Sequence, residues 1–499
     1  MISSPKSSAS SESCSQASVP CTLYPVPFPH CPPDALKIVQ LLQEHGHQAV
    51  FAGGCVRDML LGREPHDWDI ATSARPEQVE ELFPHTYAVG KQFGIITVVG
   101  EDQENYEVAT FRGDVAYSDG RHPDEIRFVD MAEDVRRRDF TCNALLGDPV
   151  AGVIHDFVGG VADLKAGVLR AVGEPERRFE EDKLRVLRAV RFAATLGFEI
   201  EPATWSAVQT YAGRVAGVVS VERIAAELEK MLLCGNGQRV LELLDSSGLL
   251  VSILPELSAF HGVQQPPQFH PEGDVWNHQL KLQGALDATV RRCQSCPADA
   301  PRFNAAGELQ RASASELRAL VWGALLHDVG KPPTCKFENG RWRFNGHDVV
   351  GAEMAEKLLR KLRLSNEVIE TAVFLVRHHM GLTAMREARI ATRRKRLQDP
   401  RFPLLLELVR LDSLASFGDL SLHAWLHEAW EEEMARPPQF TPTIQGRDLI
   451  ALGIAPCPAF KPILQAAFDH ELEEPFADHA AALAWLRDFV VKNYPELLK

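Results

Sequence analysis

A change in residue patterning near position 175 constrains the fold of this 499-residue chain most strongly. Before that point short strand-like runs alternate with helical ones, whereas beyond it amphipathic helical spacing dominates. Strands are predicted at 48–54, where the run ends in a glycine turn, and at 67–71, 94–99 and 106–111; helices are predicted at 35–42, 76–83, 176–196, 203–213, 220–233 and 237–247, with several more between 276 and 434. The pattern predicts a compact unit of strands and helices followed by an all-helical remainder.

Length and breaks in composition predict several domains, because roughly 100 to 200 residues per domain gives about three. The Ser- and Pro-rich start of the chain has too little apolar surface to fold, and Pro-rich stretches at 262–274 and 436–446 suggest boundaries. The predicted parts are a disordered tail (1–31), a strand-containing head (32–172), a helical neck and body (173–262), a second helical domain (270–420) and a helical C-terminal tail (440–499).

The net charge of −15 excludes binding to nucleic acid or anionic membrane by bulk charge, so any RNA contact must use a local basic stripe. No run of about 18 uncharged apolar residues is present, and the N-terminus lacks the apolar core of a secretory signal. Ten cysteines scattered over this length are typical of free thiols in a reducing compartment. We therefore expect a cytoplasmic protein without membrane contact.

The first candidate functional feature of the sequence is a glycine turn. Gly53 and Gly54 end a predicted strand, and a helix begins at about Val56, so backbone N–H groups and a helix N-terminus are presented together. That arrangement binds phosphate. A glycine pair alone is more often explained by tight packing, and the residues downstream are what favour a site.

Those residues are two aspartates with a spacing of two. Along a strand, Asp67 and Asp69 point to one face and can hold a pair of Mg²⁺ ions for phosphoryl transfer. An Asx turn is the alternative explanation. Glu107 shares a face with Ala109 and Phe111 on a further strand and can supply a third carboxylate, although a surface strand residue is an equally good explanation.

These residues lie in ordered motifs that resemble a known family. GGCVRDMLLGREPHDWDIATSARPEQVEELFP, YEVATFR, YSDGRHPDEIRFVD, RRRDFTCNALLGD and FEEDKLRVLRAVRFAATLGF, from about 48 to 260, resemble the class II tRNA nucleotidyltransferases, the CCA-adding enzymes, and their poly(A) polymerase relatives. The resemblance implies an α+β protein with a small mixed-sheet nucleotidyltransferase head. It implies triphosphate or nucleotide contacts from Gly53, Gly54, Arg57 and Arg138, Mg²⁺ ligation and catalysis by Asp67 and Asp69 with Glu107, and a nucleotide pocket lined by Asp182, Arg185, Arg188 and Arg191.

Elementary chemistry supports the pocket assignment. Asp182 and Arg185 form an i, i+3 pair near a helix start, which places an acceptor carboxylate beside a planar donor fork. Adenine and cytosine complement that pair, whereas guanine and uracil would leave buried groups unpaired. The alternative is a surface salt bridge worth about 0.3 to 0.5 kcal/mol. Arg188 and Arg191 continue the steps of three as a basic stripe.

YSDGRHPDE at 117–125 resembles the flexible loop that relatives need for adding the final A, which argues against an enzyme that adds only C.

A second group of residues alternates imidazole and carboxylate over successive predicted helices, as metal sites in helical bundles require. It resembles the HD phosphohydrolase superfamily over about 270–420. The resemblance implies a first metal held by His278, His327, Asp328 and Asp412, and a second at His347 and His378, with His379 an equally allowed choice. The expected metal is Ni²⁺, Mn²⁺ or Co²⁺. The expected activity is hydrolysis of a 2′,3′-cyclic phosphate, a 2′-nucleotide or a phosphomonoester.

A basic run between Arg386 and Arg396 is better explained as a solvated helix face than as a tRNA contact, and the C-terminal tail is expected only to pack against the body. The predicted function is addition of CCA to the 3′ end of tRNA from CTP and ATP, with no stable protein partner. The alternatives are an A-adding enzyme or poly(A) polymerase and, from another class, a metal-dependent HD phosphohydrolase whose head only docks RNA.

Overall fold

The computed structural model describes residues 21–88, 90–114, 126–436 and 442–497. They form two compact units, the first ending at Val219 and the second beginning at Ser220. This division falls inside the neck and body predicted over 173–262. Residues 1–20 of the predicted tail and the loop predicted at 117–125 lie outside the described residues. Within the described parts, no helix has the length and apolar character that a membrane crossing needs.

The first unit contains an eight-stranded mixed sheet, as the resemblance implied. Only β3 and β6 pair in parallel within it, and the other neighbours are antiparallel. In sheet order the strands are β1 (Thr22–Pro25), β10 (Val153–Asp156), β9 (Leu146–Asp148), β2 (Ala49–Ala52), β3 (Ile70–Thr72), β6 (Asn105–Thr110), β5 (Ile95–Val99) and β4 (Thr86–Tyr87). Two short pairs lie apart from it, β7 (Arg112–Asp114) with β8 (Ile126–Phe128) and β11 (Val168–Leu169) with β12 (Glu199–Ile200).

Strand β1 departs from the disordered tail predicted for 1–31. Its four residues pair with β10, from Thr22 opposite Asp156 to Pro25 opposite Val153. Threonine, leucine and tyrosine suit a pleated surface, and the free edge of β10 satisfies their backbone groups. A short run of three such residues beside prolines carried too weak a periodic signal to be recognised.

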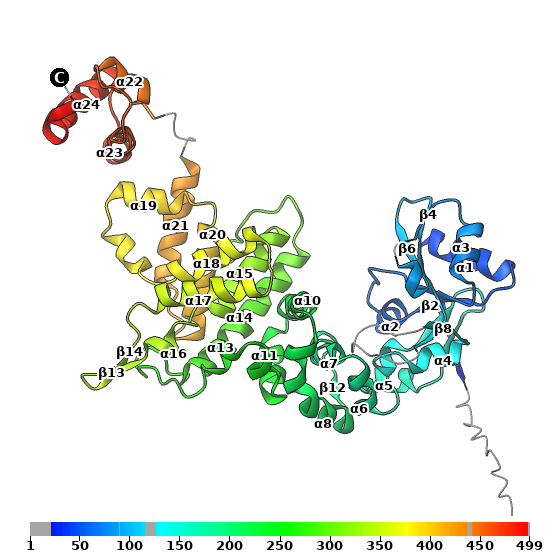
Figure 1. The fold of residues 1–499 in the computed structure, drawn as a ribbon. Helices are drawn as coiled ribbons and strands as arrows, with labels where there is room; N and C mark the ends of the chain where they lie inside the picture. The colour runs from blue at the N-terminus through cyan, green and yellow to red at the C-terminus, as the bar shows by residue number, and fades with distance from the viewer. Residues whose placement is uncertain (1–20, 89, 115–125, 437–441, 498–499) are drawn as a thin grey trace, which may run out of the picture. The chain divides into compact units, whose positions relative to one another are not determined.

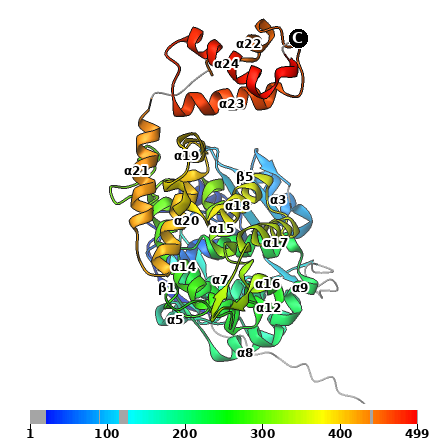
Figure 2. The same ribbon diagram turned by 90° about the vertical axis from the view of Figure 1, so that its left-hand side faces the viewer.

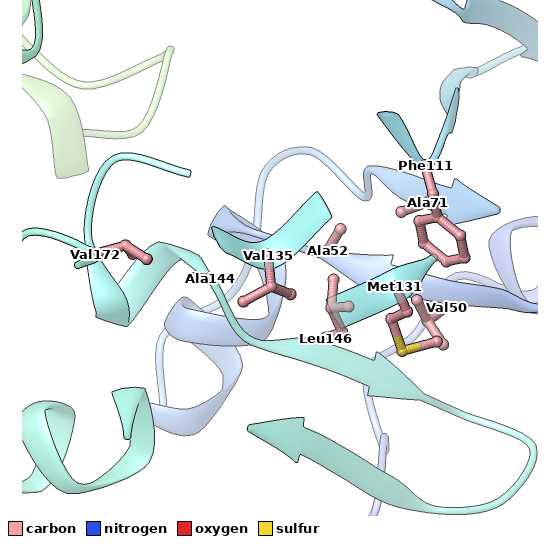
Figure 3. Close-up of a cluster of buried hydrophobic side chains, with 9 residues drawn as sticks. All are labelled: Val50, Ala52, Ala71, Phe111, Met131, Val135, Ala144, Leu146 and Val172. Atoms are coloured by element: carbon pink, nitrogen blue, oxygen red, sulfur yellow. The ribbon is translucent and has the colours of Figure 1, made fainter. Parts of the chain in front are cut away.

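The first unit contains helices before and after β9 along the chain, and the earlier ones pack against the strands of the sheet. The helices are α1 (Pro33–Glu44), α2 (Gly54–Leu60), α3 (Pro76–Leu82), α4 (Met131–Arg136), α5 (Gly160–Ala166), α6 (Pro175–Glu181), α7 (Leu184–Leu196), α8 (Pro202–Tyr211) and α9 (Val215–Val218). One core cluster joins Met131 and Val135 of α4 to Val50, Ala52 and Leu146 of the sheet, and these side chains are shown together in Figure 3. The cluster fixes α4 against the sheet face that also carries Ala71, two residues beyond Asp69.

In the part of the second unit that the structure describes, the strands form one hairpin and the other regular elements are helices. Its helices are α10 (Val221–Leu232), α11 (Gly237–Ser246), α12 (Leu249–Ile253), α13 (Pro255–Ser258), α14 (Val275–Ser295), α15 (Ala314–Leu326), α16 (Lys331–Thr334), α17 (His347–Lys361), α18 (Asn366–His378), α19 (Ile390–Leu397), α20 (Phe402–Ala415), α21 (Ser421–Ala435), α22 (Gly446–Ala451), α23 (Phe460–Glu473) and α24 (His479–Asn493). Figure 1 shows strands concentrated in the blue and cyan part of the chain and helices in the green to red part, which confirms the predicted α+β class.

The hairpin, β13 (Lys336–Glu338) with β14 (Arg341–Arg343), was not expected in an all-helical remainder. Asn339 and Gly340 at its tip both adopt positive φ, the conformation that a two-residue hairpin turn requires. At the end of the chain α22, α23 and α24 gather around their own core of Leu449, Ile463 and Leu486, and they lie together in Figure 2.

Candidate nucleotide and metal sites

The glycine turn predicted to bind phosphate connects β2 to α2. Gly53 is the N-cap of α2 and has φ 75°, which favours glycine. A Cβ at this position would lie 3.3 Å from Arg138 Nη1, so any larger residue would also press on that guanidinium. The turn therefore brings backbone N–H groups and Arg138 to the same place.

The three candidate carboxylates of the head come together at neighbouring strands. The strand assignment begins at Ile70 rather than at residue 67, but the extended backbone reaches back, since the Ala52 N–H donates to the Asp69 carbonyl at 2.9 Å. Asp67 and Asp69 are exposed and alternate with buried Trp68 and Ile70, so both aspartates share one face.

Glu107 reaches this face from β6. The parallel register pairs Ile70 with Val108, which places Glu107 beside Asp69 one step earlier. Partial desolvation of Asp69, together with repulsion from Glu107 and Asp67, raises its pKa to about 6, and Arg138 opposes that rise. Carboxylates that destabilise one another in this way gain from a shared cation, so the donor set fits Mg²⁺.

Arg138 acts on Asp69, and it shares a partner with Arg57, Asn143 of the RRRDFTCNALLGD motif. Arg57 Nη1 donates to Asn143 Oδ1 at 2.6 Å, and the guanidinium also pairs with Asp58 at 2.7 Å. Arg138 pairs with Asp134 at 3.1 Å and donates to the Asn143 carbonyl at 3.4 Å. Asn143 therefore orients both guanidinium groups. Sequence reasoning missed it, although it lies in a motif that was recognised.

The Asp182 and Arg185 pair is not arranged as predicted. The helix expected over 176–196 breaks between α6 and α7, and Asp182 lies in that break, where its carboxylate accepts from the Leu184 N–H at 3.0 Å. Arg185 pairs with Glu181 at 2.9 Å and donates to the Arg137 carbonyl at 2.9 Å. The expected i, i+3 contact is absent because the two residues do not share one helix; both side chains remain half-buried.

Arg185, Arg188 and Arg191 lie three residues apart on α7, each half-buried among buried neighbours, so they share one face. Arg188 Nε donates to the buried Asp139 carboxylate at 2.8 Å, and Arg191 stacks on Phe192 at 4.0 Å from the ring centroid. Burial opposes ionisation of Asp139, but the Arg188 charge keeps its pKa below the ordinary value. Asp139 thus orients Arg188, a role not recognised from the sequence.

Besides the group of His270, Glu272 and His278, two groups of potential metal ligands lie at one pocket of the second unit. The ligand atoms within each group lie within 4.8 Å of one another; the first group is His278, His327 and Asp412, and the second is Asp328, His347 and His379. His278 Nε2 lies 3.1 Å from Asp412 Oδ1, and His327 Nε2 lies 3.2 Å from Asp328 Oδ2. Asp328 Oδ1 lies 3.6 Å from His347 Nε2, so Asp328 stands between the groups.

Contacts with backbone carbonyls orient three of the imidazoles. The Nδ1 atoms of His327, His347 and His379 contact the carbonyls of Ala324, Phe344 and Val376 at 2.7 to 2.9 Å, which leaves each Nε2 facing the centre. The Nε2 atoms of His278 and His327 are buried and make no hydrogen bond within the described residues. Buried ring nitrogens kept free of donors beside ionised carboxylates fit divalent metal ions.

His378 is not a member of either group, which corrects the assignment of His378 to the second metal. Adjacent helical residues point about 100° apart, so only one of His378 and His379 can face the centre. His379 does, at 3.2 Å from His347 Nε2. His378 packs instead on Phe374, with ring centroids 4.7 Å apart.

Sequence reasoning also missed Glu272, whose side chain is fully buried. Its Oε1 lies 2.8 Å from the Nδ1 atoms of both His278 and His270. A carboxylate behind a ligating histidine fixes its tautomer and raises its basicity. The signal, a His and a Glu in the stretch 262–274, was treated only as a domain boundary.

The pocket around these groups has a volume of about 710 Å³ and is lined by Asp328, Lys331, His347, His379 and Asp412 together with aromatic side chains, including Phe269, Phe344 and Phe417. Lys331 Nζ lies 2.7 Å from Asp328 Oδ2 and donates to Gln265 Oε1 at 2.7 Å. A cation beside the candidate metal ligands is suited to hold an anionic substrate.

Three family models match the chain. They are the poly A polymerase head domain at residues 49–170, a probable RNA- and SrmB-binding site of polymerase A at 197–260, and the HD domain at 303–413. His278 and Glu272 precede the HD match.

The most similar curated proteins include CCA-adding enzymes. The enzyme of Lactococcus lactis subsp. cremoris (strain MG1363) is 47% identical over 216 residues, which are 43% of this chain and 53% of that enzyme. The enzyme of Geobacillus stearothermophilus is 46% identical over 217 residues, again 43% of this chain and 53% of the relative. The matched part thus spans about half the length of these relatives.

Similarity to solved structures extends over more of the chain. The crystal structure of the Bacillus stearothermophilus CCA-adding enzyme in complex with CTP matches with a TM-score of 0.64 and 29% identity, covering 93% of this chain and 100% of that one. The Thermotoga maritima CCA-adding enzyme complexed with tRNA matches with a TM-score of 0.57 and 18% identity, over 93% of this chain and 97% of that one, and supports the fold alone.

Proposed function

We propose that this chain, which carries a poly A polymerase head domain, the RNA-binding region that follows it and an HD domain, adds C, C and A to the 3′ end of tRNA from CTP and ATP. The observation that carries the proposal is the group of Asp67, Asp69 and Glu107 beside Arg138 and the glycine turn. Identity of 46 to 47% to CCA-adding enzymes over 216 to 217 residues supports the reaction type.

In this proposal the N–H groups of the Gly53 turn bind the triphosphate, with Arg57 and Arg138 held beside it by Asn143. Asp67, Asp69 and Glu107 would hold Mg²⁺, which supplies activation of the terminal ribose hydroxyl and neutralisation of phosphate charge. Pyrophosphate leaves after in-line attack on the α-phosphorus.

Nucleotide choice is proposed to rest on the half-buried side chains of Asp182 and Arg185. The Asp182 carboxylate would accept from the amino group of adenine or cytosine, and the Arg185 guanidinium, kept in orientation by Glu181 and the Arg137 carbonyl, would donate to the neighbouring ring nitrogen. Arg188 and Arg191 would contact phosphates. A base with the opposite pattern would leave these groups unpaired.

One assay tests the reaction. Purified protein with Mg²⁺ is offered CTP or ATP separately, with tRNAs that lack CCA, lack CA or lack only the terminal A. CTP incorporation on the first two and ATP on the third supports the proposal. Incorporation of A alone on the third substrate indicates an A-adding enzyme, and unlimited A addition to generic RNA indicates a poly(A) polymerase; either result rejects CCA addition.

The HD pocket favours a second activity, because two ligand groups, Lys331 and a volume of about 710 Å³ occur together. We propose metal-dependent hydrolysis of a phosphate ester, with Ni²⁺, Mn²⁺ or Co²⁺. Protein loaded with each metal is tested on a 2′,3′-cyclic phosphate, a 2′-nucleotide and a phosphomonoester. An activity missing from His327→Ala supports hydrolysis, and its absence from the wild type with all three metals rejects it.

A cytoplasmic location belongs to the same proposal. The cysteines recorded among the described residues are free thiols, which suits a reducing compartment.

A further inference from the structure

A second polar cavity lies at the junction of α18, α19 and the start of α20. Its volume is about 370 Å³, and it is lined by Phe374, His378, Thr392, Lys395, Arg396, Asp399 and Arg401. It shares no lining residue with the HD pocket. The run of basic residues between 386 and 396 thus contributes to a cavity, rather than forming only a solvated helix face as predicted.

The cations of this cavity differ in how they are neutralised. Arg401 makes a two-point pair with Asp399, at 2.9 and 2.8 Å, and Lys395 forms an ion pair with Asp469 of α23. Arg396 is half-buried, yet no carboxylate of the described residues lies within 4.0 Å of its guanidinium and no hydrogen bond from it is recorded there. Arg396 therefore has no ion-pair partner within 4.0 Å among the described groups, although Asp399 acts on it from a greater distance.

Leaving a partly buried guanidinium without an anion costs free energy. Burial lowers the pKa of Arg396, and the neighbouring Arg401 lowers it further while Asp399 opposes the shift. An anion entering the cavity would reverse both effects, because it would replace lost hydration and offset the repulsion between the two guanidinium groups.

The Phe374 ring lines the cavity and supports the guanidinium groups of Arg396 and Arg401. The Arg401 guanidinium lies 3.8 Å and the Arg396 guanidinium 6.0 Å from the Phe374 ring centroid, and the His378 ring packs on the same phenyl group. A guanidinium stacked on an aromatic face presents its N–H edges sideways, in the planar arrangement that matches phosphate oxygens.

We propose that this cavity binds a phosphate group, with Arg396 as its main ligand and Arg401 and the Thr392 hydroxyl beside it. The phosphate belongs either to the RNA backbone or to a free nucleotide, and the chemistry recognised is the same. Phosphate offers three or four oxygen acceptors and can engage two guanidinium groups at once. The site is independent of the reactions proposed for the head and for the HD pocket.

Arginine modification tests this site in the wild-type protein. The rates at which phenylglyoxal modifies Arg396 and Arg393 are followed by peptide mass spectrometry in buffer, with inorganic phosphate and with tRNA lacking CCA. Arg393 lies on the same helix, is also half-buried and does not line the cavity, so it is the matched control. Phosphate is expected to slow modification of Arg396 several-fold and to leave Arg393 unchanged. Equal rates for Arg396 with and without either ligand would overturn the proposal.

The two sources of phosphate are separated by tRNA binding. If the RNA backbone occupies the cavity, tRNA protects Arg396, and Arg396→Gln lowers the slope of log K against log salt by about one relative to Arg393→Gln. Protection by phosphate alone, with equal slopes, assigns the site to a free nucleotide or phosphate. Loss of slope without any protection of Arg396 would contradict the proposal, because the substitution would then act elsewhere. None of these readouts requires nucleotide addition, so failure of that reaction is seen separately.

Discussion

The head and the HD pocket both gather carboxylates for divalent metals, but they do so by different means. In the head, exposed Asp67, Asp69 and Glu107 stand on one face of two neighbouring strands. In the HD pocket, mostly buried side chains converge from several helices. Four of the six ligands are imidazoles, three of them fixed by backbone carbonyls and His278 by Glu272. Spacing along one strand and the pairing of β3 with β6 determine the first set, whereas the second depends on how helices pack.

The contrast between the two sites predicts that a substitution in the head nearly abolishes nucleotide addition without affecting the HD site. We expect Asp69→Ala to reduce nucleotide addition by about 10³-fold, since several kcal/mol of charge stabilisation are lost with the metal, and to leave HD phosphohydrolysis unchanged. Steady-state incorporation of CTP into tRNA and hydrolysis of a cyclic phosphate are measured on one preparation. Glu104→Gln, exposed near the start of β6, is the control. Full addition activity in Asp69→Ala would remove Asp69 from the site.

The second prediction sharpens the choice between adjacent histidines. Removal of a direct ligand should weaken metal binding more than loss of a supporting group, so His379→Ala is expected to lower affinity at the HD site by more than about 100-fold. His378→Ala, one residue away and packed on Phe374, should change it by less than about twofold. Titration of Co²⁺ followed by visible absorption measures both. The reverse result would restore the assignment of His378.

A third prediction concerns the carboxylate behind His278. Glu272→Gln keeps the size of the side chain but removes the charge that holds the imidazole, so metal affinity should fall by about 10- to 100-fold while the fold persists. Calorimetric titration of Mn²⁺ gives the affinity, with exposed Glu353→Gln of α17 as the control. An affinity equal to that of the control would limit Glu272 to packing.

The smallest expected effect is a difference between the two units in how their stability changes with acid pH. Burial lowers the pKa of His423 in α21 to about 4, so the folded state binds fewer protons there than the unfolded state. The stability it contributes is therefore present above about pH 6.5 and is lost as pH falls toward 4, by about 1 kcal/mol between pH 7 and 5.5. Asp139 in the first unit has a lowered pKa, and its contribution is lost only in stronger acid.

Hydrogen exchange read separately for the two units measures this effect. The second unit should lose more protection than the first between pH 7 and 5.5, because burial also lowers the pKa of His378 and His379 to about 4 there, while in the first unit the pKa of His155 is lowered. His423→Gln should reduce the loss in the second unit by the share that His423 contributes. His45→Gln, exposed at the end of α1, serves as the control. An equal loss in both units would show that His423 does not set the response.

The comparison also explains what sequence reasoning could reach. The alternation of Asp67, Trp68, Asp69 and Ile70 is a local property, so their common face was predictable although the strand assignment begins later. Whether His378 or His379 faces the metals depends on the rotation of α18 against its neighbours, which spacing does not contain. The break at Asp182 and the role of Glu272 were missed for a related reason, since both residues act from segments outside regular helices.

The parallel pair of strands in the sheet constrains the chain that connects them. Because β3 and β6 pair in parallel, the chain must return to the starting end of the strands between them, and the intervening α3, β4 and β5 form an excursion that leaves β3 after Thr72 and reaches β6 at Asn105, two residues before Glu107. Changes of length at the turns of that excursion alter the closure entropy only slightly and leave its anchored ends where they are. Homologous chains can therefore differ in the size of this excursion while the positions of Asp69 and Glu107 stay constant.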